Sequence, residues 1–425
     1  MPGRRRARRP RSIAAAALGA FRLALAVPVG YLTFLTASAW VATVRRAKRA
    51  PGSATRFAVL IPAHDEEAVI GGTLAALSSC SYPHELRSVH VVADHCTDRT
   101  VELATAAGVD VRENTSGRRG KGPALQWLLG GVLGDAHAAG RPIDAVVIVD
   151  ADTIVAPGFL GAVAAELEAG ATVVQGQYRV RDPDASTVTA LRSAALAVRH
   201  HLRPLGRTAI GGSCGLFGNG MAFRTDVLRA RAWSDHLTED IELQNELLLD
   251  GVLVAYAPEA VVEAAMPTTL EAARTQNERW ERGRIELARR YVPRLLRLAR
   301  RDASRRVAAV DEVLDHLVPP LSVLVAATGA AAVASTALAL RRGARRPVKG
   351  WGLVAAMTVH VGSGLVLSNA PASVYRSLLH APAMVLWKLR LWGRMLVRPG
   401  AEGWARTARD PMTESIATPG VKVRP

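Results

Sequence analysis

Cysteine is scarce in this chain, and its scarcity limits where the protein can work. The 425 residues include three cysteines, Cys80, Cys96 and Cys214. Three scattered cysteines do not make a disulfide framework, so we expect the middle of the chain to lie in a reducing compartment. Internal repeats and long low-complexity linkers are also absent. The length is sufficient for one sizeable domain with additional elements.

Acidic residues are in the minority, 37 against 54 Lys and Arg, which gives a formal net charge of +17. A surplus of this size can indicate nucleic-acid binding. The basic residues, however, cluster beside apolar runs, which is typical of juxtamembrane charge that meets anionic lipid. The clusters lie at 4–11, 45–56, 282–306, 341–349 and 388–398. We therefore expect a membrane as partner and no nucleic acid.

Charged residues are missing altogether from residues 23–44. This run could span a bilayer, which requires about 20 apolar residues. Residues 317–340 form a second such run, and 351–368 form a shorter third one. Residues 371–397 mix apolar residues with Arg and Lys, as in an interfacial helix or a fourth, tilted span. A signal peptide is an alternative for the basic N-terminus, but the apolar run is long and lacks a clean cleavage site. The prediction is a multi-pass protein of the cell membrane.

Strands and helices alternate in the middle of the chain, roughly over residues 55–265. The expected strands are 56–64, 88–94, 109–114, 144–152 and 171–180. The expected helices between them are 66–80, 98–108, 122–140 and 157–170. This alternation predicts an α/β fold with a largely parallel sheet. Ligands of such sheets bind outside the carboxyl ends of the strands, and several strands of this chain end there in polar residues.

The stretch "VVIVDADTIV" ends a buried strand in two carboxylates, Asp150 and Asp152. On an extended strand they would point to opposite faces, unless the chain turns between them. A bound divalent cation would remove their repulsion, and hard oxygen ligands suit Mg²⁺ or Mn²⁺. The alternative is a solvated loop, because Asp is common after strands.

The segment "RRGKGPALQW" places Lys121 between Gly120 and Gly122, directly before an expected helix. Backbone amides at a helix start, together with a cation, suit a phosphate. The spacing is not that of a P-loop. A solvated lysine in a turn is the alternative.

The segment "LTEDIELQNELL" begins with Thr238, Glu239 and Asp240. Thr238 can cap a helix whose first turn favours carboxylates. The functional alternative makes Asp240 a general base, which must be ionised and close to an acceptor hydroxyl.

The segment "QNERWERGR" gathers Gln276, Arg279 and Trp280 on one helix, at spacings of three and four. Arg can hold a diphosphate, and Trp can stack on a sugar or a base. The alternative is a basic amphipathic helix that lies on the membrane.

Taken in order, these segments resemble the membrane-bound family 2 glycosyltransferases, the group that includes cellulose, chitin, hyaluronan and poly-N-acetylglucosamine synthases. The matching segments are "IPAHDEE" (61–67), "VVADHCTDRT" (91–100), "RGKGPAL" (119–125), "VDADT" (149–153), "GNGMAFR" (218–224), "TED" (238–240) and "QNERW" (276–280). The resemblance implies a GT-A nucleotide-diphospho-sugar transferase domain flanked by transmembrane helices. It also implies an inverting, metal-dependent transfer from a nucleotide sugar, expected to be a UDP sugar, to a lipid or glycan acceptor.

The resemblance further implies roles for single residues. Ala63, His64 and Glu66 would line the uridine pocket. Asp94 would contact the base or the ribose, and Lys121 would lie near the nucleotide.

The remaining implied roles concern the metal, the base and the acceptor. Asp150 and Asp152 would bind Mg²⁺ or Mn²⁺, with Asp152 the more direct ligand. Glu239 and Asp240 would be catalytic, with Asp240 as the base. The Gln-x-x-Arg-Trp residues would hold the diphosphate and the acceptor beside the membrane: Gln276, Arg279 and Trp280. "GGSCGLFGNG" (211–220) would form the floor of the acceptor site.

Two departures from the family pattern bear on function. His95 stands where relatives often have Asn. The synthases that export long polymers tend to have more spans than this chain, so a single sugar transfer to a lipid acceptor stays open. A nucleotidyltransferase and a non-catalytic membrane scaffold on the same fold are the alternatives.

The predicted organisation has five parts, with the catalytic domain in the cytoplasm. They are a basic segment and transmembrane helix (1–50), the GT-A domain (51–285), an interfacial basic helix (286–310), C-terminal transmembrane or interfacial helices (311–400) and a tail (401–425). The basic clusters at 45–56 and 282–306 suit a cytoplasmic location, whereas those at 4–11 and 341–349 fit it poorly.

Overall fold

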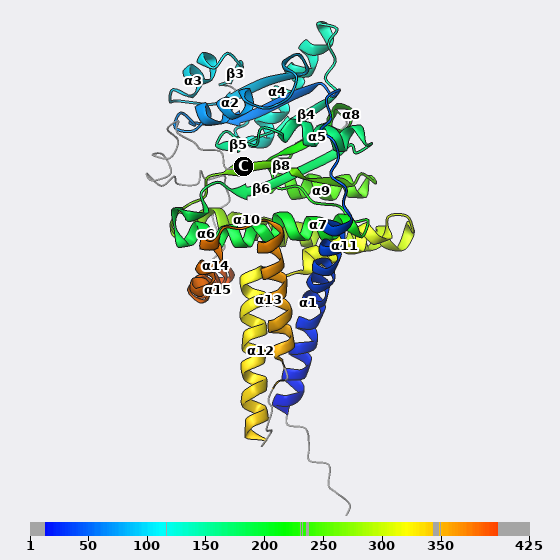
Figure 1. Cartoon of the computed structure of the whole chain (residues 1–425), viewed down its shortest axis with the longest axis vertical. Helices are drawn as coiled ribbons and strands as arrows, with labels where there is room; N and C mark the ends of the chain where they lie inside the picture. Colours follow the sequence, from blue (N-terminus) through cyan, green and yellow to red (C-terminus); the bar gives the residue numbers. More distant parts are fainter. Residues whose placement is uncertain are drawn as a thin grey trace, which may run out of the picture.

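The computed structural model describes residues 13–115, 117–229, 231, 233–234, 238–342, 348 and 350–397. The basic segment before residue 13 and the predicted tail lie outside the described residues. Figure 1 shows three levels along the long axis of the molecule. A sheet with helices forms one end, a level of helices runs across the middle, and long helices extend along the axis at the other end.

The sheet has eight strands among the described residues, in the order β3-β2-β1-β4-β7-β6-β8-β5. The strands are β1 Phe57–Ala63, β2 Arg87–Asp94, β3 Asp110–Asn114, β4 Ala145–Ile148, β5 Thr153–Val155, β6 Val173–Val180, β7 Met221–Arg224 and β8 Val254–Ala264. Only β7 and β5 run against the other strands. The α/β fold with a mostly parallel sheet is therefore confirmed.

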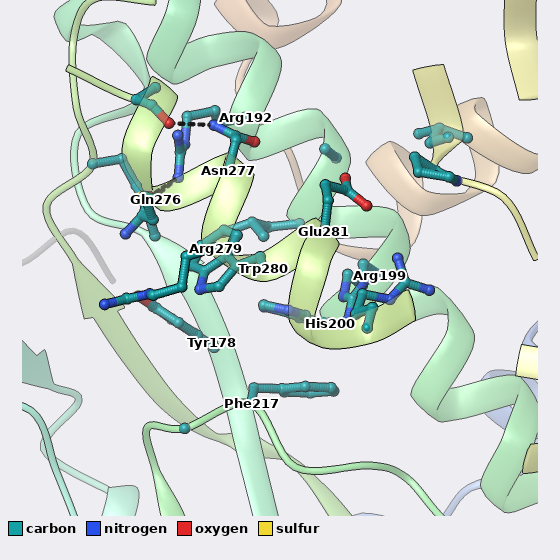
Figure 2. Close-up of a pocket in the computed structure, with 18 of the residues that line it drawn as sticks. Tyr178, Arg192, Arg199, His200, Phe217, Gln276, Asn277, Arg279, Trp280 and Glu281 are labelled. Carbon is teal, nitrogen blue, oxygen red and sulfur yellow. Dashed lines mark hydrogen bonds between the residues drawn. The ribbon is translucent and has the colours of Figure 1, made fainter. Parts of the chain in front are cut away.

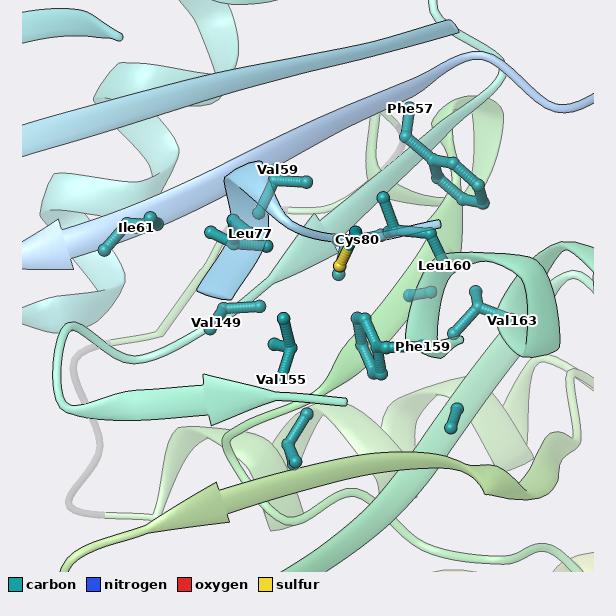
Figure 3. Packing of buried hydrophobic residues seen from close by; sticks show 14 of the residues in the cluster. Phe57, Val59, Ile61, Leu77, Cys80, Val149, Val155, Phe159, Leu160 and Val163 are labelled. Carbon is teal, nitrogen blue, oxygen red and sulfur yellow. The ribbon is translucent and has the colours of Figure 1, made fainter. Parts of the chain in front are cut away.

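Apolar side chains of β1 alternate between two cores, one on each face of the sheet. Phe57, Val59 and Ile61 belong to the first core, and Ala58 and Leu60 to the second. Figure 3 shows the first core, in which the β1 side chains meet Leu77 and Phe159. This double burial explains why the strand is apolar throughout.

Helices cover both faces of this sheet. The first core includes residues of α2 Ile70–Ser78, α3 Thr100–Ala106 and α5 Phe159–Glu168. The second includes residues of α4 Lys121–Ala138 and α9 Glu239–Leu249. The short elements η1 His84–Leu86, η2 Pro183–Ala185 and α8 Thr225–Arg229 complete the domain.

The expected strand 144–152 is two strands separated by a turn. β4 ends at Ile148, and β5 pairs antiparallel with β8 at the far edge of the sheet. The turn is closed by the amide of Thr153, which donates to the carbonyl of Asp150 over 3.2 Å. The chain therefore turns at the two carboxylates, as their cooperation requires.

The middle level consists of helices that run across the long axis (Figure 1). They are α6 Thr187–Ala197, the π-helical η3 Val198–Leu202, α7 Arg203–Ala209, α10 Arg274–Arg301 and α11 Arg306–Leu317. α10 continues without a break through residue 285, where the sequence suggested a domain boundary.

The long helices are α1 Ile13–Arg45, α12 Leu321–Arg341 and α13 Trp351–Leu367. α1 and α12 are long and apolar enough to cross a membrane, whereas α13 is a shorter apolar helix. The remaining elements are α14 Ala372–Ser377, η4 Leu378–His380 and α15 Ala381–Val397. In Figure 1, α15 is seen end-on beside the long helices, so its axis is perpendicular to the long axis of the molecule. Whether it is an interfacial helix or a fourth span stays a prediction.

Close helix contacts and buried charge join the middle level to the long helices. A Cβ added to Gly206 of α7 would lie 2.4 Å from the carbonyl oxygen of Leu35 in α1. Arg207 pairs with Asp311 (Nε to Oδ2, 2.7 Å) and with Glu312, all three buried. The hydroxyl of Tyr31, on α1, donates to Asp311 over 2.7 Å. The three levels therefore form one packed unit.

Candidate active site

One cavity of about 1430 Å³ contains every candidate site residue of the sequence. It begins at the carboxyl ends of β1, β2 and β4 and reaches past the middle level to the long helices. Its lining includes all twelve predicted residues: Ala63, His64, Glu66, Asp94, Lys121, Asp150, Asp152, Glu239, Asp240, Gln276, Arg279 and Trp280. The fold thus gathers residues that are more than 200 positions apart in the sequence.

The turn between β4 and β5 presents its two carboxylates to this cavity. The side-chain oxygen of Asn219 accepts a hydrogen bond from the Asp150 amide (3.2 Å), and its nitrogen donates to Thr153 (2.7 Å). Burial and then the charge of Asp150 raise the pKa of Asp152 to about 6. Asp152 has no ion pair among the described residues. The Asp152 oxygens fit a divalent cation, because a carboxylate without an ion-pair partner is a ligand that a hard cation binds.

Lys121 is the cation closest to this turn. Its Nζ lies 2.5 Å from Oδ1 of Asp150 and 2.6 Å from the carbonyl oxygen of Gly218. Lys121 begins α4, and Gly120 before it has a φ of 126°, which favours glycine. Burial alone would lower the pKa of Lys121, but the charges of Asp150, Glu239 and Asp240 outweigh it and raise that pKa. The solvated-lysine alternative is therefore wrong.

The ends of β1 and β2 form the other wall of the cavity. Asp94 accepts from Asn114 (2.8 Å) and from the backbone of Gly120 (3.2 Å), so it holds the loop that carries Lys121. His64 Nδ1 lies 2.6 Å from the carbonyl oxygen of Asp94. His95 has a φ of 53°, a left-handed conformation in which Asn and His are enriched. The backbone thus explains why His can replace Asn at this position.

Glu239 and Asp240 open α9 beside Lys121. Thr238 occupies the N-cap position but makes no side-chain capping hydrogen bond to this helix. Asp240 Oδ1 accepts from the Ile241 amide over 2.8 Å. A Cβ on Gly218 would lie 3.3 Å from Asp240 Oδ2 and 3.8 Å from Lys121 Nζ, so the three groups meet at this glycine. Burial is the main cause that raises the pKa of Asp240 and that of Glu239, the latter to about 7.

Gln276, Arg279 and Trp280 approach the cavity from α10 (Figure 2). Gln276 accepts a hydrogen bond from Arg192 of α6, and the Arg192 guanidinium lies 5.7 Å from the centre of the Trp280 ring. These contacts fix Gln276 and Trp280. Arg279 makes no hydrogen bond or ion pair with any described residue, and its Nε is buried.

Several site residues had no predicted role of their own, although Phe217 and Asn219 lie in the predicted floor of the acceptor site. Tyr178, His200 and Phe217 stack in a row, with ring centres 5.4 and 4.1 Å apart. Burial raises the pKa of Tyr178, and the nearby Asp152 adds to this effect. Asn219 was quoted within "GNGMAFR" without a role of its own. Arg192 has no local signal, because its role depends on the packing of α6 against α10.

Comparison with known proteins gives one family match. Residues 54–283 match the family described as "Glycosyltransferase like family 2". A probable glycosyltransferase, YdaM, of Bacillus subtilis (strain 168) is 26% identical over 260 residues, which cover 58% of this chain and 59% of the relative. A beta-monoglucosyldiacylglycerol synthase of Synechocystis sp. is 28% identical over 237 residues, which cover 53% of this chain and 47% of the relative. The chain therefore matches about half the length of these relatives.

One solved structure resembles the chain over most of its length. It is the mannosyltransferase PcManGT from Pyrobaculum calidifontis, with a TM-score of 0.50 and 20% identity. The match covers 87% of this chain and 99% of that chain. At this identity the likeness concerns the fold, and it confirms the predicted GT-A architecture.

Proposed function

Since the chain belongs to the glycosyltransferase-like family 2 and is a glycosyltransferase, we propose that it moves a sugar from a UDP sugar to a lipid or polysaccharide acceptor at a membrane. The observation that carries this proposal is the single cavity. At the end of the cavity next to the sheet lie Asp150, Asp152 and Lys121. The opposite end is lined by apolar residues of α12 and α13. A soluble donor and a membrane acceptor could therefore meet inside one space.

The proposed chemistry is a single displacement with inversion. Asp240 takes the proton of the acceptor hydroxyl, whose oxygen bonds to the anomeric carbon. The bond between that carbon and the diphosphate oxygen breaks on the opposite face. Lys121 and Arg279 hold the diphosphate, because charge-assisted hydrogen bonds to phosphate are strong.

Asp150 and Asp152 would hold Mg²⁺ or Mn²⁺ in this proposal. When bound, the cation neutralises charge on the leaving diphosphate. The donor set supports this assignment, because it consists of carboxylate oxygens at a turn. The Pyrobaculum structure is a complex with GDP-mannose and Mn²⁺, so GDP sugars are a second donor class to be tested.

The membrane setting is part of the proposal. α1 and α12 are long and apolar enough to span a bilayer, and the Arg-rich α10 lies between the sheet and these helices (Figure 1). Basic residues on that level suit the cytoplasmic side, where nucleotide sugars are made available. The small number of spans favours a single transfer to a lipid over polymer export, and the name of the Synechocystis relative, a glucosylated-diacylglycerol synthase, agrees with a lipid product.

The test uses the purified, detergent-solubilised protein with Mn²⁺, a panel of UDP and GDP sugars, and a membrane lipid extract as acceptor. Release of free nucleoside diphosphate with a sugar-bearing product of lipid size would support the proposal. Release of pyrophosphate would identify a nucleotidyltransferase instead. Nucleotide binding without any turnover across the panel would favour the scaffold alternative.

A further inference from the structure

Two arginines face the cavity near the candidate base and interact with carboxylates only through longer-range charge. Arg199 belongs to η3 and Arg284 to α10, and both line the main cavity and a small adjoining pocket. Neither forms a hydrogen bond or an ion pair with any residue that the structure describes. Cations held in such a position are costly unless an anion joins them.

The carboxylates nearest to these arginines are already paired. Asp315 forms an ion pair with Arg203, and Glu281 lies 3.6 Å from Lys388. Arg207 also lies 3.9 Å from Asp315, and the charges of Arg199 and Arg284 act on the same carboxylate, so four arginines share it. Burial, together with the charges of Arg284 and Arg203, lowers the pKa of Arg199 to about 9. Figure 2 shows Arg199 at the same end of the site as Glu281, away from Gln276.

Two different surroundings meet at this pair of arginines. On one side lies Asp240. Burial raises the pKa of Asp240, and the positive charge of Arg199 lowers it in part. On the other side the cavity continues between the long helices and α15, where its lining is largely apolar: Val325, Met357, Val361, Leu378, Met384 and Val385. A ligand that is complementary to this part of the cavity has a hydroxyl for Asp240, an anionic group for the two arginines and an apolar chain for the apolar lining.

We propose that Arg199 and Arg284 bind the phosphate of the acceptor, and that the acceptor is a lipid whose head group carries a free hydroxyl beyond its phosphate. The proposal rests on the function proposed above and names its acceptor class. The hydroxyl lies at Asp240, the phosphate lies between the two guanidinium groups, and the acyl or prenyl chain lies among the apolar residues of α12, α13 and α15. This anion site is separate from the one for the donor diphosphate, which involves Lys121 and Arg279.

The test measures binding of defined lipids to the delipidated protein in detergent, by native mass spectrometry and titration. The probes are phosphatidylglycerol, which has a phosphate and head-group hydroxyls, diacylglycerol, which has no phosphate, and soluble glycerol phosphate, which has no chain. We expect phosphatidylglycerol to bind at least about tenfold more tightly than diacylglycerol, because a hydrogen bond to a charged group is worth a factor of this order. Glycerol phosphate should compete only weakly with phosphatidylglycerol for binding, because it has no apolar chain. Equal binding of diacylglycerol would overturn the proposal, and strong competition by glycerol phosphate would show a site for free phosphate esters.

Matched variants separate this site from general lipid adhesion. Arg199→Gln and Arg284→Gln should each lose the preference for phosphatidylglycerol, whereas Arg199→Lys should keep part of it. Arg289→Gln is the control, because Arg289 lies on the same helix, is exposed and has no partner among the described residues. Unchanged binding in both Gln variants would contradict the proposal.

A melting curve of the lipid-free protein distinguishes an anion site from a structural role. Removing one of two unpaired, mutually repelling cations should leave the melting temperature unchanged or raise it. A lowered melting temperature with unchanged lipid preference would assign Arg199 to the fold. UDP affinity, measured on the same preparations, should not change in these variants. If the wild-type protein binds phosphatidylglycerol as expected but turns over no donor, the proposed function fails while the anion site stands.

Discussion

The ammonium of Lys121 lies 2.5 Å from Asp150 Oδ1 and bridges the carboxylate turn to the carbonyl of Gly218. Because a Cβ at Gly218 would also lie only 3.3 Å from Asp240 Oδ2, this lysine is the positive centre around which the carboxylate turn and the candidate base are arranged. A donor diphosphate with its cation would enter the same place. Lys121 therefore links donor binding to the protonation of the base.

Replacing Lys121 should change the pH dependence of the reaction. A carboxylate beside a cation has a lower pKa than it would have alone, so Lys121→Met should raise the pKa of the Glu239–Asp240 pair. The wild-type acid limb of kcat/KM is expected at a higher pH than the ordinary pKa of an aspartate would give, because burial raises the pKa of Asp240 and a base must be deprotonated. In Lys121→Met that limb should move to higher pH, whereas Lys121→Arg should keep it closer to the wild type. A limb that does not move would show that Lys121 has no influence on the base.

Asp240→Asn should remove the base without removing the donor site. General-base catalysis contributes typically about 10² to 10⁴-fold, so turnover should fall by at least roughly the lower figure while UDP affinity is kept. Asp226→Asn is the control for a change at a helix start, because Asp226 in the first turn of α8 also accepts from the following amide, over 3.0 Å. Near-normal turnover in Asp240→Asn, with a lower melting temperature, would show that Asp240 stabilises the fold and is not the base.

Asp152→Asn tests the metal site. Because a cation would join the carboxylate turn to the diphosphate, this variant should lose Mn²⁺-dependent UDP binding and turnover together. The structure adds a second readout. Burial and Asp150 disfavour the charged form of Asp152 in the folded protein. Ionisation of Asp152 therefore destabilises the metal-free protein as pH rises from its ordinary pKa of 3.8 toward about 6.

The metal-free Asp152→Asn variant should consequently melt higher than the wild type above that pH window, and the difference should vanish below it. The measurement is a set of thermal melts with and without Mn²⁺, at one pH above this window and one pH below it. If UDP binding in the variant keeps its full Mn²⁺ dependence, direct ligation by Asp152 is wrong.

Gly206→Ala should disturb the contact between α7 and α1. The new methyl group would lie 2.4 Å from a backbone carbonyl oxygen, and backbone cannot rotate away as a side chain can. Overpacking of this kind costs typically about 1–3 kcal/mol of the free energy of unfolding. Gly30→Ala, in α1, is the control, because a Cβ there meets nothing within 4 Å. Equal melting temperatures for the two variants would show that α1 can shift without cost.

Local patterns in the sequence predict a large part of this fold. The apolar runs of β1 and β4 are short-range features, and so are the segments that carry Lys121, Asp150 and Asp240. The family resemblance then brings these residues into one site. The edge strand β5 was not predicted, since its three residues pair with β8, about 100 positions later. A strand of that length has no periodicity of its own.

The end of the site next to the long helices could not be predicted from local patterns for a related reason. Arg192 and Arg199 resemble the many other arginines of the chain, and only the tertiary placement of α6 and η3 brings them to the cavity. The stacked row of Tyr178, His200 and Phe217 combines residues from three segments. The orientation of α15 relative to the long helices likewise depends on its neighbours, because its mixture of apolar and basic residues fits two arrangements.

The buried charges around Arg207 have a consequence for how this enzyme can be divided. Arg203 and Arg207 lie within the family domain, but their partners Asp311, Glu312 and Asp315 lie beyond its end. A chain cut after residue 285 would keep the cations and lose every one of these anions, and removing one side of a buried pair costs typically about 3–5 kcal/mol. The helices after residue 285 thus contribute to the stability of the domain as well as attaching it to the long helices. They supply the carboxylates that neutralise the buried arginines of that domain. A chimaera in which an unrelated membrane helix replaces them should therefore not fold stably unless it keeps α11.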